Sequence, residues 1–307
     1  MIVVLGSINT DIVTATETLP GPGETVLGPG YEMAAGGKGL NQAIAAARLK
    51  APGGRPVTMV GAVGEDPLSS LPLKALGNSG VDTHFVRRTV LPTGCAFITV
   101  DRKGENQITV AQGANLGVEA ADVPDTLLSA ETTTICQMEI PGQEVTECLA
   151  RTHAAGGRTI LNIAPYASLE AETLASVDFL VANQVEALAL AREHGIAAND
   201  PSSLVCNLAG LGADAMTVVL TLGSAGAIAF TDGKILNFPA PEIQPVDSTG
   251  AGDTFVGALA ARLDEGADIE AALAFSVVAG ALACLERGAA PSITDRSAAM
   301  AAMRLHE

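Results

Sequence analysis

The chain has 307 residues, of which 48% are hydrophobic and 17% charged, so it is long enough to bury a large core and is composed like a globular protein. It carries 17 Lys and Arg against 34 Asp and Glu, which gives a formal net charge of -17. That excess of negative charge argues against nucleic acid and anionic membrane surfaces as partners. A bound phosphate would have to be neutralised locally, by backbone amides, a metal ion or a well-placed lysine.

Five cysteines lie far apart and show no C-x-x-C spacing, so neither a disulfide framework nor a zinc site is predicted. They are Cys95, Cys136, Cys148, Cys206 and Cys284. Four scattered histidines, the last of them His306, form no metal-ligand pattern. No apolar run reaches membrane-spanning length, and residues 1–5 lack the flanks of a signal peptide, so we expect a cytoplasmic protein.

The chain begins with a β-branched run at residues 2–5, typical of a strand, which leads into Gly6-Ser7-Ile8-Asn9-Thr10-Asp11. In an open α/β sheet, ligands collect beyond the carboxyl ends of the strands. Asn9 and Asp11 are therefore candidate substrate contacts. A plain turn is the alternative, because Asn and Asp are common in turns.

Two segments, residues 11–35 and 93–112, show short strand-like pieces and no helical periodicity. Glycines and prolines interrupt the first segment around a strand-like piece at residues 25–27. The second has two β-like runs on either side of a turn at residues 101–106, which predicts a hairpin. We expect the two segments to form a small β-sheet that covers a larger domain of residues 1–10, 36–92 and 113–307.

Between these segments, Gly36-Gly37-Lys38-Gly39-Leu40-Asn41 opens a helix that runs to residue 49. The stretch is not a Walker A loop, because Glu32 stands where that motif needs its first glycine and Gly39 where it needs serine or threonine. The glycines suit close approach of the backbone to a hydroxyl-rich ligand, with Lys38 and Asn41 as donors. An unusual helix start is the alternative.

Apolar β-like runs alternate with alanine- and leucine-rich helical stretches over most of the remaining chain. The runs are residues 58–63, 134–138, 159–162, 179–182 and 217–222. This alternation predicts an α/β fold with a mostly parallel central sheet covered by helices, and a last helix at residues 298–307.

Small or polar residues follow two of these runs. Residues 221–226, Thr-Leu-Gly-Ser-Ala-Gly, suit a loop beside a nucleotide, although any tight turn looks similar. Asn183-Gln184-Val185-Glu186 follows another run, and Glu186 is suited either to holding a hydrated Mg²⁺ through water or to beginning a helix.

A glycine-rich stretch at residues 247–255, Asp-Ser-Thr-Gly-Ala-Gly-Asp-Thr-Phe, runs into a helical pattern that ends near Leu263. The first N–H groups of a helix have no intrahelical partner and its dipole is positive there, so this start attracts anions. Asp253 either completes the first turn as a cap or acts as a general base beside an anion hole. The second role suits transfer of a phosphoryl group to a hydroxyl.

Taken in order, these segments resemble the ribokinase family of carbohydrate kinases, also called the PfkB family, over essentially the whole chain. The matching segments are residues 6–11, 22–25, 36–43, 221–224 and 247–255. Five glycine motifs in register are far more specific than one. The resemblance implies a ribokinase-like α/β fold with a small β-sheet lid, which also forms a homodimer contact. It further implies ATP-dependent phosphorylation of a pentose, D-ribose to ribose 5-phosphate being expected.

The resemblance also implies roles for individual residues. Asp253 would be the base, and the anion hole would be formed by Gly250, Ala251 and Gly252. The residues that would hold the sugar are Asn9, Asp11, Gly36, Gly37, Lys38, Asn41 and Glu139. Those that would contact ATP are Asn183, Thr221, Gly223, Ser224, Gly226 and Gly252, with Glu186 binding Mg²⁺ through water. An activating K⁺ would lie at Asp247, Thr249, Ala283, Glu286, Gly288 and Ser292.

Two positions depart from the family pattern. Val277 stands where relatives can carry a polar nucleotide contact, and Glu286 stands where a basic residue is usual in the cation loop. A cation contact made by a backbone carbonyl would survive the second change.

Four alternatives compete with a pentose kinase. A nucleoside or pseudouridine kinase of the same family is disfavoured by the absence of Trp and the presence of only two Tyr. A sugar-phosphate kinase would need extra basic residues, for which Arg102 and Lys103 are the candidates. Asp253 and its glycines argue against a non-catalytic sugar sensor, and no G-x-G-x-x-G follows the first strand as a dinucleotide-dependent oxidoreductase requires.

Overall fold

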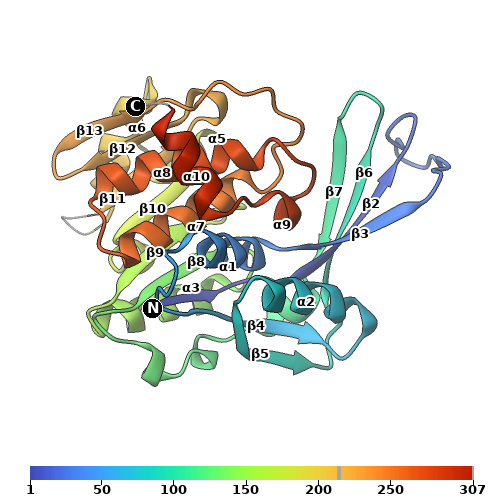
Figure 1. The fold of residues 1–307 in the computed structure, drawn as a ribbon, viewed down its shortest axis with the longest axis horizontal. Coiled ribbons are helices and arrows are strands. Elements are labelled where there is room, and N and C mark those ends of the chain that lie inside the picture. Colours follow the sequence, from blue (N-terminus) through green and yellow to red (C-terminus); the bar gives the residue numbers. More distant parts are fainter. Residues whose placement is uncertain (213–215, 306–307) are drawn as a thin grey trace.

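Two β-sheets organise the chain, whose computed structural model describes residues 1–212 and 216–305. The larger has nine strands in the order β13-β12-β11-β10-β9-β8-β1-β4-β5, and the smaller has four in the order β3-β2-β6-β7. Figure 1 shows the small sheet standing away from the larger one, which helices cover. The predicted fold class, a mostly parallel sheet with helices and a small β-sheet, is confirmed. His306 lies outside the described residues.

Seven parallel strands form most of the large sheet. They are β1 (Ile2–Leu5), β4 (Val57–Gly64), β5 (Asp82–Thr89), β8 (Thr133–Gln137), β9 (Arg158–Asn162), β10 (Phe179–Asn183) and β11 (Thr217–Thr221). An antiparallel pair, β12 (Ala227–Thr231) and β13 (Lys234–Phe238), extends the sheet at one edge.

Helices cover both faces of this sheet, so the central strands are apolar on both sides. Along β1, Ile2 and Val4 join one core with α1, α2, α7, α8 and α10, whereas Val3 and Leu5 join the other with α3, α5 and α6. The helices are α1 (Lys38–Leu49), α2 (Ser70–Asn78), α3 (Gly142–Ala154), α4 (Ala171–Leu174), α5 (Gln184–Glu193), α6 (Pro201–Ala209), α7 (Ala251–Asp264), α8 (Ile269–Ala283), α9 (Ala289–Ser292) and α10 (Arg296–Arg304).

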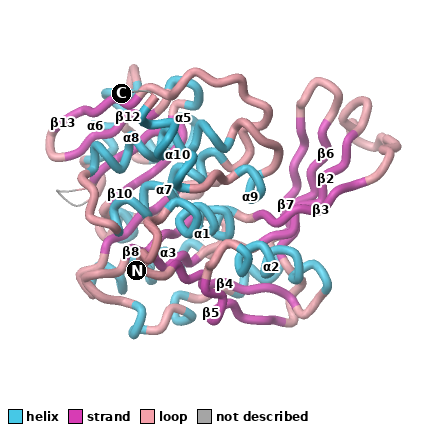
Figure 2. Tube along the Cα trace, viewed as in Figure 1, coloured by secondary structure: helices cyan, strands magenta, loops and turns pink. Residues whose placement is uncertain are grey.

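In Figures 1 and 2 most of the small sheet stands clear of the helices, although α2 and α9 contact its strand β3. Its strands are β2 (Asn9–Ala15), β3 (Tyr31–Gly36), β6 (Gly94–Val100) and β7 (Asn106–Ala111), and β6 and β7 form the predicted hairpin. The strand expected at residues 25–27 is absent. Glycines and prolines flank that segment, and Leu27 is 88% exposed, so nothing there pairs or packs.

Both sheets meet where the chain crosses between them. Three residues separate β1 from β2, and Gly37 alone separates β3 from α1. Gly37 has a φ of 94°, a left-handed value that favours glycine, and a Cβ there would lie 2.9 Å from the Asn9 backbone nitrogen. The crossing therefore places the start of β2 and the start of α1 side by side.

Helices α1 and α7 cross at very short distance. A Cβ on Gly257 of α7 would lie 2.5 Å from the Ala45 Cβ and 2.6 Å from the Gln42 carbonyl oxygen, both on α1. Only glycine at this position permits the contact. As a result the first turns of the two helices, one carrying residues 38–42 and the other residues 250–253, face the same space.

Candidate active site

The residues predicted to hold a sugar lie at the crossing between the sheets. Asn9 is buried, and its side-chain oxygen accepts a 2.7 Å hydrogen bond from the Asn115 amide. The carboxylate of Asp11 lies over Gly36, where a Cβ would collide with its oxygens. Gly36, Gly37, Lys38 and Asn41 lie in the same region, because β3, α1 and the glycine between them carry these residues.

Glu139 follows β8 and caps the start of α1. Its Oε2 accepts hydrogen bonds from the Ser7 hydroxyl at 2.5 Å and from the Lys38 backbone N–H at 3.1 Å. A carboxylate at this end of a helix is stabilised by the unpaired N–H groups and by the dipole. Glu139 therefore fixes the start of α1 against the first strand, in addition to any contact with a ligand.

Carboxylates from three separate segments act on one lysine, Lys38. The carboxylate of Asp253, more than those of Glu139 and Glu186, raises the pKa of Lys38 above its usual value, although burial acts in the opposite direction. Burial raises the pKa of Asp11 from its ordinary 3.8 to about 6, with smaller contributions from Glu139 and Asp253. Strongly perturbed groups gathered in one place are typical of functional sites.

Asp253 is 7% exposed, and a side-chain amide donates to each of its oxygens. The Asn41 Nδ2 donates to Oδ2 and the Gln42 Nε2 donates to Oδ1, both at 2.9 Å. Both donors come from α1, across the close contact with α7. The carboxylate is thus oriented by amides, while a lysine supplies the nearby positive charge.

The start of α7 is open to a ligand beside Asp253. Gly250 adopts a left-handed φ of 78°, and a Cβ there would lie 2.8 Å from the Ala289 Cα. At Gly252 a Cβ would meet nothing within 4 Å, so this turn faces free space. The N–H groups of this first turn have no intrahelical acceptor. A negatively charged group can therefore approach the backbone next to the carboxylate.

A cavity of about 580 Å³ adjoins this helix start. Its lining includes most of the residues predicted to contact a nucleotide, namely Thr221, Gly223, Ser224, Gly226 and Gly252. Phe255, Val277 and Cys284 provide an apolar wall, and of these three the sequence had pointed only to Val277 as lying beside the nucleotide. The volume and the mixed lining are typical of a small-molecule site.

Asn183, the remaining predicted nucleotide contact, is not among the residues that line this cavity. It forms a capping box with Glu186 at the start of α5, where each side chain accepts a 2.9 Å hydrogen bond from the other's backbone N–H. Burial raises the pKa of Glu186, while the Asn183 N–H and Lys38 act against that effect. Glu186 thus combines the capping role with a place in the charged cluster.

The loop predicted to bind K⁺ is closed by Asp247. Its Oδ1 accepts from the Thr249 N–H and hydroxyl, and its Oδ2 accepts from the Gly288 N–H. Burial raises the pKa of this carboxyl, but these hydrogen bonds and Arg287 outweigh burial and bring it below its ordinary value. The other residues predicted for this site lie on the adjoining segment 283–292, where Ala283 and Ser292 are buried and Glu286 is exposed.

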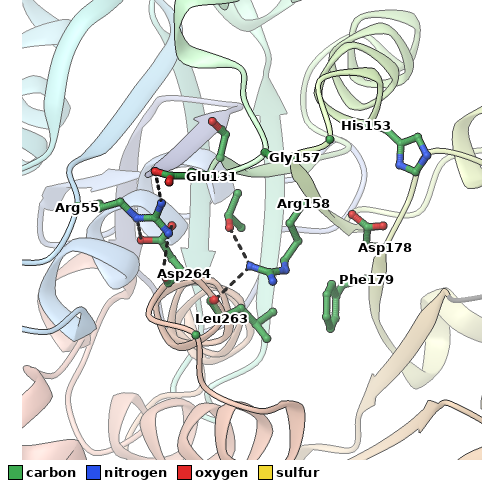
Figure 3. Close-up of a pocket in the computed structure, with 14 residues that line it drawn as sticks. Arg55, Glu131, His153, Gly157, Arg158, Asp178, Phe179, Leu263 and Asp264 are labelled. Carbon is green, nitrogen blue, oxygen red and sulfur yellow. Dashed lines mark hydrogen bonds and ion pairs between the residues drawn. The ribbon is translucent and has the colours of Figure 1, made fainter.

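A second cavity, of about 690 Å³, lies at the opposite ends of the strands, beside the amino ends of β8, β9 and β10. Figure 3 shows that both of its arginines are already engaged with neighbouring side chains or with the backbone. Arg55 pairs with Glu131 and Asp264, and Arg158 donates to the Leu263 carbonyl. Because neither Asp253 nor a glycine-rich helix start borders it, this cavity is not the predicted site.

An anion-attracting helix start, a buried carboxylate and an adjoining cavity lie together here, which are features that phosphoryl transfer uses. A family model described as pfkB family carbohydrate kinase matches residues 1–296. The chain belongs to that family, as its glycine motifs predict, and it is a carbohydrate kinase. The predicted enzyme class is therefore confirmed.

Named relatives cover the whole chain. It is 36% identical over 304 residues to the ribokinase of Schizosaccharomyces pombe, covering 95% of this chain and 94% of the relative. It matches the crystal structure of ribokinase from Thermotoga maritima with a TM-score of 0.90 and 32% identity, covering 99% of each chain. It matches Arabidopsis thaliana ribokinase complexed with ribose and ATP with a TM-score of 0.88 and 33% identity, covering 99% of this chain and 98% of that one.

The described residues contain neither a helix suited to span a membrane nor a metal-binding cluster. None of their helices is both long enough and apolar enough to cross a membrane. Within the same residues, no group of three or more His, Cys, Asp and Glu is arranged to hold a metal ion.

We predict that Asp11→Asn stabilises the folded protein at neutral pH. With a folded pKa of about 6 against an ordinary 3.8, the folded state holds more protons than the unfolded state between these values. The free energy of unfolding therefore falls as pH rises through this window. Removing the charge should raise it by about 1–3 kcal/mol above pH 6, and the gain should vanish below about pH 4. Urea unfolding at several pH values measures the difference.

Asp66→Asn is the matched control of opposite sign. Burial raises the pKa of Asp66, but hydrogen bonds from Thr93, Leu68 and Ser69 outweigh burial and lower it below its ordinary value. That substitution should destabilise the protein at neutral pH. Equal stability of Asp11→Asn and the unaltered protein at pH 8 would contradict the prediction.

Proposed function

We propose that this carbohydrate kinase transfers the γ-phosphoryl group of ATP to a pentose, with D-ribose converted to ribose 5-phosphate, and that it does so in the cytoplasm. One observation carries the proposal. Asp253 lies in the first turn of α7, between the crossing that holds Asn9, Asp11 and Lys38 and the cavity of about 580 Å³. The relatives named as ribokinases, one of them complexed with ribose and ATP, support the choice of substrates.

The sugar would occupy the polar side of Asp253. Asn41 donates its Nδ2 to that carboxylate, while its own Oδ1 is buried without a hydrogen-bond partner in the described part of the chain. A buried acceptor without a donor is costly, and a sugar hydroxyl would satisfy it. The same amide would then connect the sugar to the base, with Asn9, Asp11, Lys38 and the Gly36–Gly37 backbone around the remaining hydroxyls.

The transfer needs little covalent chemistry from the protein. Asp253 would accept the proton of the attacking hydroxyl as the new oxygen–phosphorus bond forms and the bond to ADP breaks. The N–H groups at Gly250, Ala251 and Gly252 would stabilise the negative charge on the transferred group. Lys38 would add its positive charge beside them.

The cavity lined by Thr221–Gly226 loop residues would bind ATP, its base against the apolar wall of Phe255, Val277 and Cys284. Mg²⁺ would neutralise the phosphates, held through water by Glu186, whose carboxylate already interacts electrostatically with Lys38 and Asp253. We place K⁺ at the loop that Asp247 closes. Because Asp247 already accepts three hydrogen bonds, backbone carbonyls of residues 283–292 would supply most of the ligands.

A substrate panel tests this function. In a coupled ADP assay with ATP and Mg²⁺, D-ribose should give the highest kcat/KM among pentoses, hexoses and nucleosides, and K⁺ should give faster turnover than Na⁺. Omitting Mg²⁺ should abolish turnover. A preference for a nucleoside would overturn the ribose assignment, and equal rates in K⁺ and Na⁺ would remove the potassium site.

Asp253→Asn tests the base. The amide cannot accept the proton, so kcat should fall at least about 100-fold while calorimetry still shows sugar binding. Asp268→Asn is the control, because Asp268 caps the start of α8 by accepting from the Ala271 N–H at 2.7 Å. That variant should keep normal turnover. Near-normal turnover in Asp253→Asn would show that its carboxylate serves the helix alone.

We further propose that residues 11–35 and 93–112 act as a lid and join two copies of the chain. Exposed apolar side chains on the small sheet support this, since such patches mark contact surfaces. They are Tyr31, Met33, Phe97, Ile108 and Val110. The strand register places Met33, Ile12 and Phe97 in one row on one face, whereas Asp11, Ala96 and Val110 share the other. Thus Met33 and Phe97 lie on the face that points away from Asp11, whereas Val110 shares the face that carries the Asp11 carboxylate.

Phe97→Asp tests the dimer. A charge in the apolar row should shift the protein from dimer to monomer in sedimentation velocity measurements, because an unpaired charge is costly to bury in an interface. Leu305→Asp, which changes a more exposed apolar residue outside the small sheet, should leave the dimer intact. A monomeric unaltered protein, or a Phe97→Asp variant that still dimerises, would refute this interface.

A further inference from the structure

Beneath Asp253 lies a chain of buried side-chain amides. Gln42 of α1 is fully buried, and so is Gln137 at the end of β8, while Asn162 at the end of β9 is nearly so. The Gln42 Nε2 donates to Asp253 Oδ1 at 2.9 Å and to Asn162 Oδ1 at 3.0 Å. Its Oε1 accepts from the Gln137 Nε2 at 2.7 Å. None of these three amides was among the predicted site residues.

A backbone carbonyl of the large sheet determines which amide donates and which accepts in each hydrogen bond of this network. The Asn162 Nδ2 donates to the carbonyl oxygen of Val181 in β10, so its Oδ1 must face Gln42. Gln42 therefore has to turn its Nε2 toward both Asn162 and Asp253. A flipped Gln42 would set its oxygen against two acceptor oxygens and its NH₂ against the Gln137 NH₂, whereas the observed arrangement leaves only one oxygen of these three amides, the Gln137 Oε1, without a partner among the described residues.

We propose that Gln42 is a positioning residue for the reaction, whose amide, oriented by Gln137 and Asn162, donates to the Asp253 carboxylate and holds it aimed at the sugar hydroxyl. The inference rests on the proposed role of Asp253 as the base. Gln42 touches neither sugar nor nucleotide and acts through the carboxylate alone. Asn41, by contrast, keeps a free acceptor for the sugar.

Two physical effects make this contact matter for turnover. Asp253 is almost fully buried, and burial disfavours a charged carboxylate unless donors stabilise it. Its two amide donors supply that stabilisation, and one of them is Gln42. The same contact limits rotation of the carboxylate, which has to stay aligned with the attacking hydroxyl, and misalignment of a catalytic group is costly.

Other charges also act on Asp253. Lys38 of α1, Asp11 of β2 and Glu186 of α5 interact with it electrostatically, and Glu139 after β8 acts on the same cluster. Asp11 has a pKa of about 6, so it titrates within the range of an acid limb. The pH test therefore needs measurements with Asp11 unaltered and with Asp11→Asn.

The test replaces two of the amides, Gln42 and Gln137, by Met, an apolar side chain of similar length. In Gln42→Met, kcat should fall about 10- to 100-fold, the effect of one hydrogen bond to a charged group, while the KM for ribose stays nearly unchanged. The acid limb of the kcat/KM profile should move to higher pH, and should do so in the Asp11→Asn background too. Gln137→Met, which does not touch Asp253, should show the same changes at smaller size because it removes the donor to the Gln42 Oε1 and so loosens the side chain that holds Asp253.

Thr134→Val is the matched control, since Thr134 lies on the same strand as Gln137, is equally buried and bonds the Thr152 hydroxyl at 2.9 Å instead. It should lower thermal stability without moving the acid limb. If Gln42→Met or Gln137→Met folds and behaves like Thr134→Val, the amide chain only packs the core and the proposal fails. Should Gln42→Met not fold, Gln137→Met decides by the same criterion.

A double-mutant cycle separates this inference from the proposed base. If Gln42 acts only through Asp253, Gln42→Met should have little further effect on the residual turnover of Asp253→Asn. An equally large loss in both backgrounds would overturn the positioning role and leave the base intact. Normal turnover of Asp253→Asn itself would instead overturn the proposed function.

Discussion

The close crossing of α1 and α7 at Gly257 is the constraint on which the site depends. A side chain at this position would overlap Ala45 and the Gln42 carbonyl, and would push the two helices apart. Both amide donors to Asp253 come from α1, at hydrogen-bond lengths of 2.9 Å. A separation of even 1 Å would break them. A packing contact at Gly257, a residue without a side chain, thus determines whether the Asp253 carboxylate is held.

A chain with a net charge of -17 still builds a place for an anion, because the relevant charges are local. The start of α7 offers backbone N–H groups to the space beside Gly252, and Lys38 lies within the field of three carboxylates. Those carboxylates keep the lysine charged despite its burial. Burial and the neighbouring carboxylates disfavour the charged form of Asp11, whose pKa rises to about 6. The carboxylates of the site therefore repel one another. A bound cation or phosphate-bearing ligand would change this repulsion.

The sequence predicted the elements whose signals are local. Apolar runs located five strands to within about one residue, and the glycine motifs located the starts of α1 and α7. It missed the β12–β13 pair, although Asp232-Gly233 between them is a standard two-residue hairpin signal, with both residues at positive φ. It also missed Gln42, Gln137 and Asn162. Each lies within or beside an apolar run, and only the packing of α1 on the ends of β8 and β9 shows that their amides meet.

The crossing between the two sheets couples the small sheet to the chemistry. Asn115 ties the Ile8 N–H and the Asn9 side chain together, and Gly94 leaves the room in which these amides meet. On the other side, β3 continues through Gly37 directly into α1, whose next turn holds Asp253. A rotation of the small sheet about these points would move Asp11 and the start of α1 together. The small sheet and the Asp253 carboxylate are therefore structurally coupled, because the same few residues join the two sheets and border the site.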